Sequence, residues 1–163
     1  LRACLERGVP LTRRRGGGCA VVLDPGNVVV SVALPVQGIG DNPRHFRRLS
    51  AWLIHGLTRA GWPGVRQAGI SDLALGQHKV GGACIYRTRG LLYYSASLLL
   101  EPRLELIERY LRHPPREPDY RAGRGHREFL ASLPLPAGSI RAAADAPHRL
   151  RPLLPLDALC DRD

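Results

Sequence analysis

The 163-residue chain contains no methionine, and only one of its 24 basic residues is a lysine, Lys79. No apolar stretch approaches the about 20 residues that a membrane-spanning helix needs, so a membrane protein is not expected. Residues 1–15 carry five arginines and no apolar run of signal-peptide length. The four cysteines lack CxxC spacing, so they are expected to be free thiols and no metal site is predicted. These absences favour a cytoplasmic protein.

The remaining composition is that of a globular domain with a positive surface. Hydrophobic residues make up 44% of the chain and charged residues 23%, which is normal for a folded domain. The formal net charge of +10 predicts an anionic partner, whether nucleic acid, nucleotide or acidic protein. Because the chain begins with Leu1, we expect a fragment of a larger protein.

Lys79 stands out because every other basic residue is an arginine. A bias that replaces lysine by arginine leaves a lysine where a compact ammonium group cannot be exchanged for a planar guanidinium. Chance survival of one lysine is the alternative. Lys79 is therefore a candidate functional residue.

The hydrophobic pattern predicts an α+β domain. Apolar residues 20–23 and 28–34 flank a turn signal, which predicts a hairpin. A helix is predicted from an N-cap at Asp41 to Gly61. An antiparallel meander of short strands is predicted for residues 65–67, 72–75, 80–87 and 91–99. Two later helices are predicted, one that opens at Pro102 and is ended by Pro114-Pro115, and one over residues 124–133.

Two glycine-containing segments carry the chemistry. Gly16, Gly17 and Gly18 follow three arginines and allow backbone N–H groups to approach an anionic or carbonyl-bearing ligand. No Gly-Lys-Ser/Thr follows, so this loop is not a Walker A motif. Further along, Asp72 and Lys79 lie on neighbouring predicted strands and should face each other across a tight hairpin. A bare salt bridge is the alternative interpretation of that pair.

These segments resemble the biotin/lipoate A/B protein ligase family, and within it the large domain of the lipoate-protein ligases. The family's Arg-Arg-x-Ser-Gly-Gly-Gly-x-Val-x-His-Asp-x-Gly-Asn signature aligns without a gap onto residues 13–27, with matches at Arg13, Arg14, Gly17, Gly18, Val21, Asp24, Gly26 and Asn27. Its Asn-Asp-Leu and Lys-Ile-Ser-Gly-Ser-Ala segments align onto residues 71–73 and the stretch that begins at Lys79.

The chain departs from the family pattern at several polar positions: Gly16, Cys19, Leu23, Ser71, Gly81 and Tyr94-Ser95 replace Ser, Gly, His, Asn, Ser and a His pair. Substrate or activity could therefore differ from the family's. The resemblance also implies that strands before the glycine loop are missing, so residues 1–133 are expected to be a ligase-like catalytic domain without its N-terminal strands. Residues 134–163 are expected to be a Pro/Ala/Arg-rich tail.

The resemblance implies an α+β fold of the class II synthetase/biotin-ligase type, with a mixed, mainly antiparallel sheet and packed helices. It implies ATP-dependent activation of lipoate or octanoate to an acyl-AMP, with Mg²⁺, and transfer to a lysine of an acidic lipoyl carrier domain or H-protein. Lys79 would be catalytic. Contacts to substrate and ATP would come from Arg14, Gly16, Gly17, Gly18, Asn27, Asp72, Gly82 and Ala83.

The sequence also allows three alternative functions. An acyl-carrier-dependent octanoyl or lipoyl transferase would use Cys19 or Cys84 as the nucleophile, although no histidine is placed by sequence to activate either thiol. A non-catalytic ligase-like binding domain would agree with the replaced polar residues. Nucleic-acid binding could use the arginine clusters, but no RRM, KH or helix-turn-helix pattern is found, and nucleic acid is not the expected partner.

Overall fold

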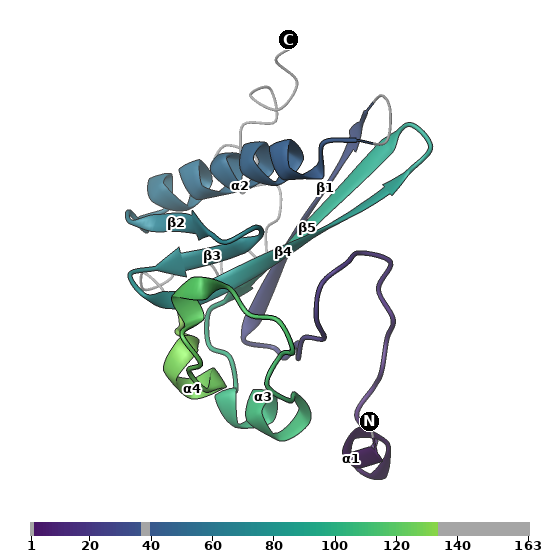
Figure 1. The fold of residues 1–163 in the computed structure, drawn as a ribbon, viewed down its shortest axis with the longest axis vertical. Coiled ribbons are helices and arrows are strands. Elements are labelled where there is room, and N and C mark those ends of the chain that lie inside the picture. The colour runs from purple at the N-terminus through teal and green to yellow at the C-terminus, as the bar shows by residue number, and fades with distance from the viewer. Residues whose placement is uncertain (1, 37–39, 134–163) are drawn as a thin grey trace.

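A computed structural model describes residues 2–36 and 40–133. Its centre is a five-stranded antiparallel sheet in the order β1-β5-β4-β3-β2 (Figure 1). The strands are β1 (Asn27–Pro35), β2 (Val65–Ala68), β3 (Asp72–Leu75), β4 (His78–Thr88) and β5 (Leu91–Leu99). The helices are α1 (Arg2–Glu6), α2 (Asn42–Arg59), α3 (Leu104–Tyr110), the 3₁₀ turn Asp119–Arg121 and α4 (His126–Phe129).

The predicted meander is confirmed. Strands β2 to β5 follow one another in the sheet, and each pairs antiparallel with the next. Gly76 and Gly90 occupy the turns before β4 and β5 with φ of +57° and +73°, a region that glycine enters without steric cost. The long hairpin of β4 and β5 forms the middle of the sheet.

The predicted hairpin of residues 20–23 with residues 28–34 is wrong. Strand β1 pairs with β5 instead, and residues 20–23 belong to no strand. Gly26 explains the difference, because its carbonyl accepts hydrogen bonds from the N–H groups of Leu100 and Glu101, 3.0 and 2.9 Å away. These bonds tie the turn to the end of β5, so the chain before the turn leaves the sheet. β1 is therefore an edge strand of the sheet, and the apolar residues 20–23 form part of a loop.

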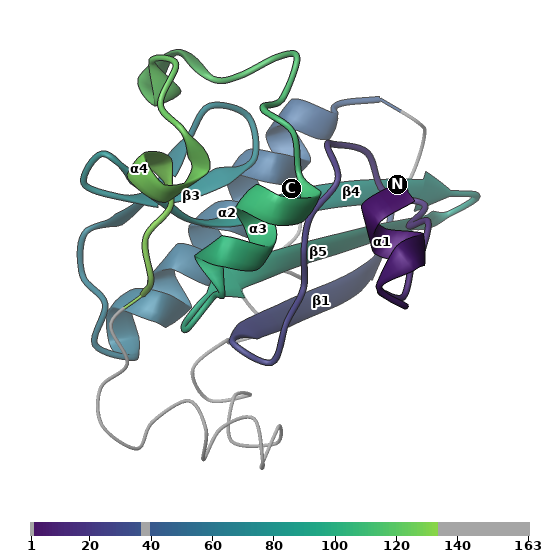
Figure 2. The ribbon, with the colours of Figure 1, turned by 90° about the horizontal axis from the view of Figure 1, so that it is seen from below.

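Helix α2 covers one face of the sheet, as predicted, and α3 and α4 lie on the other face (Figure 2). The side chain of Asp41 caps α2 by accepting a hydrogen bond from the Arg44 N–H, 3.3 Å away. Leu49 and Leu53 of α2 are both 1% exposed and belong to the core formed with the sheet. The core therefore lies between α2 and the sheet, and a cavity lies on the opposite face of the sheet.

The helices after β5 are shorter than predicted. The helix expected from Pro102 is α3, and Ile107 is its buried residue. The helix expected over residues 124–133 is reduced to α4, because the chain leaves the helix to pair with β4. The N–H of Ala131 donates to the carbonyl of Lys79 at 3.0 Å, and Leu130 forms a parallel bridge with Lys79. The predicted tail, 134–163, lies outside the described residues.

Candidate active site

A cavity of about 590 Å³ is lined in part by α3 and α4, the helices on the face of the sheet opposite α2 (Figure 2). Its floor is formed by β1, β3, β4 and β5, and its walls by residues 18–23 and by the segment from α3 to α4. Five cationic side chains line it, from Arg14, Lys79, Arg112, Arg116 and Arg121. Asp72 is the one carboxylate among its described lining residues. This charge balance favours an anionic ligand.

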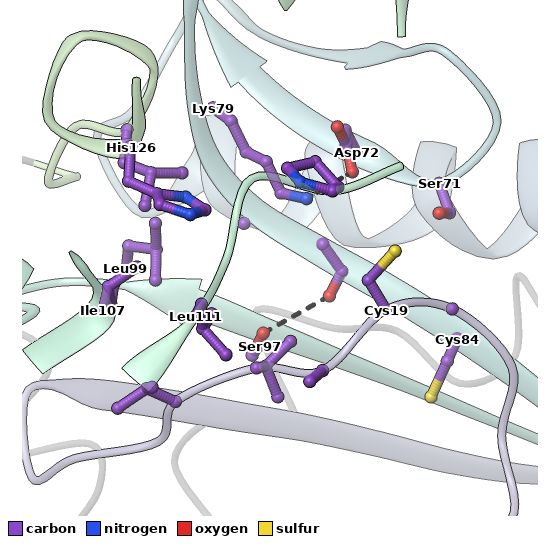
Figure 3. A pocket seen from close by; sticks show the side chains of 18 of the residues that line it. Cys19, Ser71, Asp72, Lys79, Cys84, Ser97, Leu99, Ile107, Leu111 and His126 are labelled. Atoms are coloured by element: carbon purple, nitrogen blue, oxygen red, sulfur yellow. Dashed lines mark hydrogen bonds and ion pairs between the residues drawn. The ribbon is translucent and has the colours of Figure 1, made fainter. Parts of the chain in front are cut away.

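Lys79 and Asp72 both line the cavity and point toward each other (Figure 3). Lys79 Nζ lies 2.6 Å from Asp72 Oδ1, and the two side chains are only 28% and 14% exposed. The predicted meeting across the hairpin is therefore confirmed. A partly buried pair of this kind is screened less by salt than a surface ion pair.

A β-bulge turns Lys79 into the cavity. Leu73 pairs with Gly81, but Ala74 pairs with Lys79, so Val80 is the extra residue in β4. The bulge lets Val80 enter the core, where it is fully buried, and brings Lys79 onto the same face as Gly82. Without the extra residue, strict alternation would send the lysine toward α2.

Gly82 leaves the space that the lysine occupies. A Cβ built at Gly82 would lie 3.1 Å from Lys79 Nζ, 3.2 Å from Lys79 Cε and 3.6 Å from Asp72 Oδ1. Gly82 pairs with Asp72 across the strands, which explains why both contact the lysine. Ala83 also lines the cavity, and its N–H donates to the Ser71 carbonyl at 2.8 Å.

The glycine loop is held in shape by Arg14. The Arg14 guanidinium donates to the carbonyls of Gly17, at 3.0 Å, and Cys19, at 2.5 Å. Gly18 adopts φ +94° and lines the cavity together with Arg14. Gly16 packs on Cys84, since a Cβ there would lie 2.7 Å from Cys84 Sγ. Gly16 and Gly17 do not line the cavity, so they contribute to the conformation of the loop and not to the cavity wall.

Asn27 lies at the floor of the cavity beside the turn that starts β1. Its Nδ2 donates to Asp24 Oδ1 at 3.1 Å, and Asp24 also accepts from the N–H groups of Gly26 and Arg103. Asn27 Oδ1 is buried and has no hydrogen-bond partner within the described residues. A buried carbonyl oxygen without a partner costs free energy, so a ligand that donates a hydrogen bond fits here.

The replaced polar positions divide between core and cavity. Tyr94 is fully buried on the α2 side, with its hydroxyl 3.4 Å from Ser50 Oγ. Burial raises the pKa of Tyr94, so it remains neutral. Ser71 and Ser95 line the cavity, as do Cys19 and Cys84. The substitution at Tyr94 therefore changes the core and not the cavity wall.

The segment between α3 and α4 supplies site residues that sequence reasoning did not assign. Arg121 is only 5% exposed, and its guanidinium lies 4.7 Å from the ring centre of Phe129. Burial, followed by the charge of Arg121, lowers the pKa of His126, which keeps this cavity residue neutral at pH 7. Tyr120 donates from its hydroxyl to Asp72 Oδ2 at 3.0 Å. No spacing rule links residues 48 positions apart, so only the folded chain reveals this contact.

Within residues 2–36 and 40–133, no three His, Cys, Asp or Glu side chains come close enough together to hold a metal ion. In the same part of the chain, no helix is both long and apolar enough to cross a bilayer. The site is therefore characterised by its cationic lining, the Lys79–Asp72 ion pair and its apolar walls. The apolar lining consists of Ala20, Val21, Val22, Leu23, Val29, Ala83, Leu99, Ile107, Leu111, Pro114, Pro115, Pro118, Phe129 and Leu130.

Comparison with known proteins agrees with this architecture. A lipoate–protein ligase of Streptococcus pyogenes serotype M5 (strain Manfredo) is 34% identical over 108 residues, which cover 66% of this chain and 31% of that protein. The chain thus spans about a third of that curated relative.

Two solved structures share the fold. A bipartite lipoate protein ligase from Thermoplasma acidophilum, studied with its E2 lipoyl domain, has a TM-score of 0.73 at 22% identity and is matched over 97% of this chain and 61% of its own. A lipoate-protein ligase A bound with ATP has a TM-score of 0.71 at 22% identity, over 97% of this chain and 62% of its own. The α+β fold expected from the resemblance, with its mainly antiparallel sheet and packed helices, is confirmed.

The family itself follows from a match over most of the sequence. Residues 1–138 match the model of the lipoyl protein ligase A/B catalytic domain. The same residues contain the glycine loop, the bulged strand with Lys79 and the segment that walls the cavity. The chain therefore belongs to the lipoyl protein ligase A/B catalytic domain family.

Proposed function

We propose that the protein acts in the cytoplasm, activates lipoate or octanoate with ATP to form an acyl-AMP, and transfers the acyl group to a lysine of a lipoyl carrier domain. The observation that carries the proposal is the Lys79 ammonium, held 2.6 Å from Asp72 inside a cationic cavity with apolar walls. An apolar wall suits an acyl chain, and the cationic side suits a carboxylate and phosphates. Residues 1–133 would form the ligase-like catalytic domain.

Lys79 would act in both steps. In the first, a carboxylate oxygen of the acid attacks the α-phosphorus of ATP and the bond to the β-phosphate oxygen breaks, releasing pyrophosphate. In the second, the acceptor amine attacks the acyl carbonyl, and AMP leaves with the bonding electrons. A fixed ammonium group stabilises the negative charge that grows on the oxygens in each step. Asp72 orients this ammonium, and Gly82 leaves room for it.

The other predicted residues would hold the reactants. Arg14 keeps the glycine loop folded, so the N–H group of Gly18, which lines the cavity, can bind an acyl-phosphate oxygen, while Gly16 and Gly17 support the loop. Asn27 Oδ1 would accept a hydrogen bond from the nucleotide. Ala83, which has a small side chain, allows close approach at the floor.

Mg²⁺ belongs to the same proposal. Both oxygens of Asp72 are already engaged, by Lys79 and Tyr120, and Asp72 is the one carboxylate among the described lining residues. The residues present therefore fit an ion held mainly by the phosphates of ATP, as is common for Mg²⁺. Bound in this way, the ion would neutralise phosphate charge.

The acceptor would be an acidic lipoyl carrier domain or H-protein. The chain has a formal net charge of +10, which would steer an acidic domain toward it. The Thermoplasma neighbour was studied with its E2 lipoyl domain, which supports this class of partner.

The first experiment measures pyrophosphate release with ATP, Mg²⁺ and lipoate or octanoate. We expect release that depends on the acid, and a loss of about 10²–10³-fold in rate for Lys79→Ala. Lys79→Arg should be similarly inactive, because a planar guanidinium pairs with a carboxylate through two nitrogens and cannot copy a point charge. His78→Ala is the matched control, since His78 is exposed, precedes Lys79 and does not line the cavity.

A cysteine-dependent transferase is the alternative that the cavity also allows, because Cys19 and Cys84 line it. Such an enzyme would transfer an acyl group from an acyl-carrier thioester without ATP. Transfer that needs no ATP and disappears in Cys19→Ser or Cys84→Ser would replace the ligase proposal. A folded protein without either activity would be a binding domain.

A further inference from the structure

The Lys79 and Asp72 pair has a third member that lies outside the cavity lining. Asp72 uses Oδ1 for Lys79, at 2.6 Å, and Oδ2 for the Tyr120 hydroxyl, at 3.0 Å. Each oxygen of the Asp72 carboxylate therefore has its own partner, and the two contacts together restrict rotation of the carboxylate. Tyr120 does not line the cavity, so its hydroxyl would act on a ligand through Asp72.

The hydrogen bond has a fixed direction. Burial first, and the charge of Asp72 second, raise the pKa of Tyr120 above its usual value. The phenol therefore stays protonated across the working range, and a carboxylate can only accept. A donor on a carboxylate makes a charge-assisted bond, which is stronger than a bond between neutral groups.

Tyr120 is itself held firmly relative to the start of β4. Its ring lies 5.1 Å from that of Phe129, in a tilted arrangement typical of aromatic pairs. Arg124 Nη2 donates to the carbonyl of Tyr120 at 2.8 Å and to the carbonyl of Gln77 at 2.7 Å. Gln77 precedes Lys79 by two residues. Arg124 therefore joins the 3₁₀ turn that carries Tyr120 to the turn that leads into the lysine strand.

We propose that Tyr120 is a positioning residue for the adenylating lysine, which it orients by fixing the carboxylate of Asp72. The inference rests on the proposed function. Without the hydroxyl, Asp72 could rotate about its Cβ–Cγ bond and carry the ammonium away from the developing charge. Since that charge is fully present only in the transition state, the loss would fall on kcat more than on KM.

The kinetic test compares Tyr120→Phe with Tyr93→Phe. Both variants remove one hydroxyl that donates to a side-chain oxygen, because Tyr93 donates to Ser31 Oγ at 2.8 Å outside the cavity lining. We expect Tyr120→Phe to lower kcat for pyrophosphate release about tenfold, the effect of one hydrogen bond to a charged group, with KM values within about twofold. Tyr93→Phe should match the wild type.

The second readout uses the single lysine of the chain. Protein grown with lysine that carries ¹³C at Cε alone gives one lysine Cε NMR signal, that of Lys79. Tyr120→Phe should move this signal and Tyr93→Phe should not. An unchanged signal, or an unchanged kcat in an active protein, would overturn the inference. If the wild type releases no pyrophosphate, the proposed function fails and the NMR signal alone decides the role of Tyr120.

Folding of the variants is checked by thermal unfolding. Phe keeps the ring that packs on Phe129, so Tyr120→Phe should remain folded. If it does not, Arg124→Gln is the second variant, since it keeps the Tyr120 hydroxyl, removes the guanidinium that links Tyr120 to Gln77 and adds no second lysine. The same two readouts then apply, and an Arg124→Gln protein with wild-type kcat and an unshifted lysine signal would overturn the inference.

Discussion

Two adjacent glycines on β4 should respond to alanine in opposite ways. Gly82 faces the cavity, where a Cβ would lie 3.1 Å from Lys79 Nζ and 3.2 Å from Lys79 Cε. Gly81 faces the opposite side, where a Cβ would lie 2.7 Å from the carbonyl oxygen of Ser97. The first contact is with the end of a flexible side chain, and the second is with the backbone of the neighbouring strand. Gly82→Ala should therefore affect activity, and Gly81→Ala should affect stability.

The magnitudes follow from these distances. An ordinary contact needs about 3.4–4.0 Å, so Gly82→Ala should push the ammonium aside by a few tenths of an ångström. Because a shift of about 1 Å can cost roughly 10²-fold in rate, we expect kcat to fall about three- to tenfold. The free energy of unfolding should stay within about 1 kcal/mol, since alanine in a strand also lowers the entropy of the unfolded chain. Gly81→Ala should cost about 1–3 kcal/mol through overpacking.

The assay combines pyrophosphate release with urea unfolding for both variants and the wild type. Each variant differs from the wild type by one methyl group, so each serves as the control for the other. The reasoning is refuted if Gly82→Ala keeps full activity, because the ammonium would then tolerate displacement. It is also refuted if Gly82→Ala is destabilised more than Gly81→Ala.

Two further predictions concern stability. Gly26→Ala would place a Cβ on top of the Glu101 carbonyl and break the link between the turn and β5, so it should lower the free energy of unfolding by about 3 kcal/mol or more, measured by urea unfolding. Hydrogen bonds from the Gly123 N–H, and next from the His113 side chain, lower the pKa of Glu117 in the folded protein. The ionised Glu117 carboxylate therefore stabilises the fold above its unfolded-state pKa, and this stabilisation is lost as the pH falls through its folded-state pKa. Glu117→Gln should therefore lower Tm at pH 7, and a deficit that did not shrink below about pH 4.3 would contradict this.

Much of the fold was predictable because local signals agreed with the tertiary structure. The Asp41 cap, the helix after it and the meander of four strands all formed where turn residues and periodicity placed them. The hairpin at residues 20–23 failed because the turn at Gly26 is hydrogen-bonded to the end of β5, so residues 20–23 run along the cavity wall and β1 pairs with β5. Strand partners that are distant in sequence leave no local signal.

The candidate site divides in the same way. Lys79 and Asp72 were found because they lie on consecutive strands and because the lysine is compositionally unique. The bulge at Val80, which turns the lysine toward Gly82, has no signature that periodicity would reveal. Tyr120 was missed for a different reason, because its contact with Asp72 depends on how Arg124 docks a separate segment onto Gln77.

The geometry also explains why an arginine-biased chain would retain a lysine at this one position. The Nζ of Lys79 lies 2.6 Å from Asp72 Oδ1 on one side. On another side it lies so close to Gly82 that even a single Cβ at that position would crowd it. A guanidinium is wider, and its parallel N–H groups would engage both carboxylate oxygens, one of which is occupied by the Tyr120 hydroxyl. Arginine would have to displace that hydroxyl or leave the pair. Only an ammonium group fits between Asp72 and Gly82 while keeping donors free for an anionic ligand.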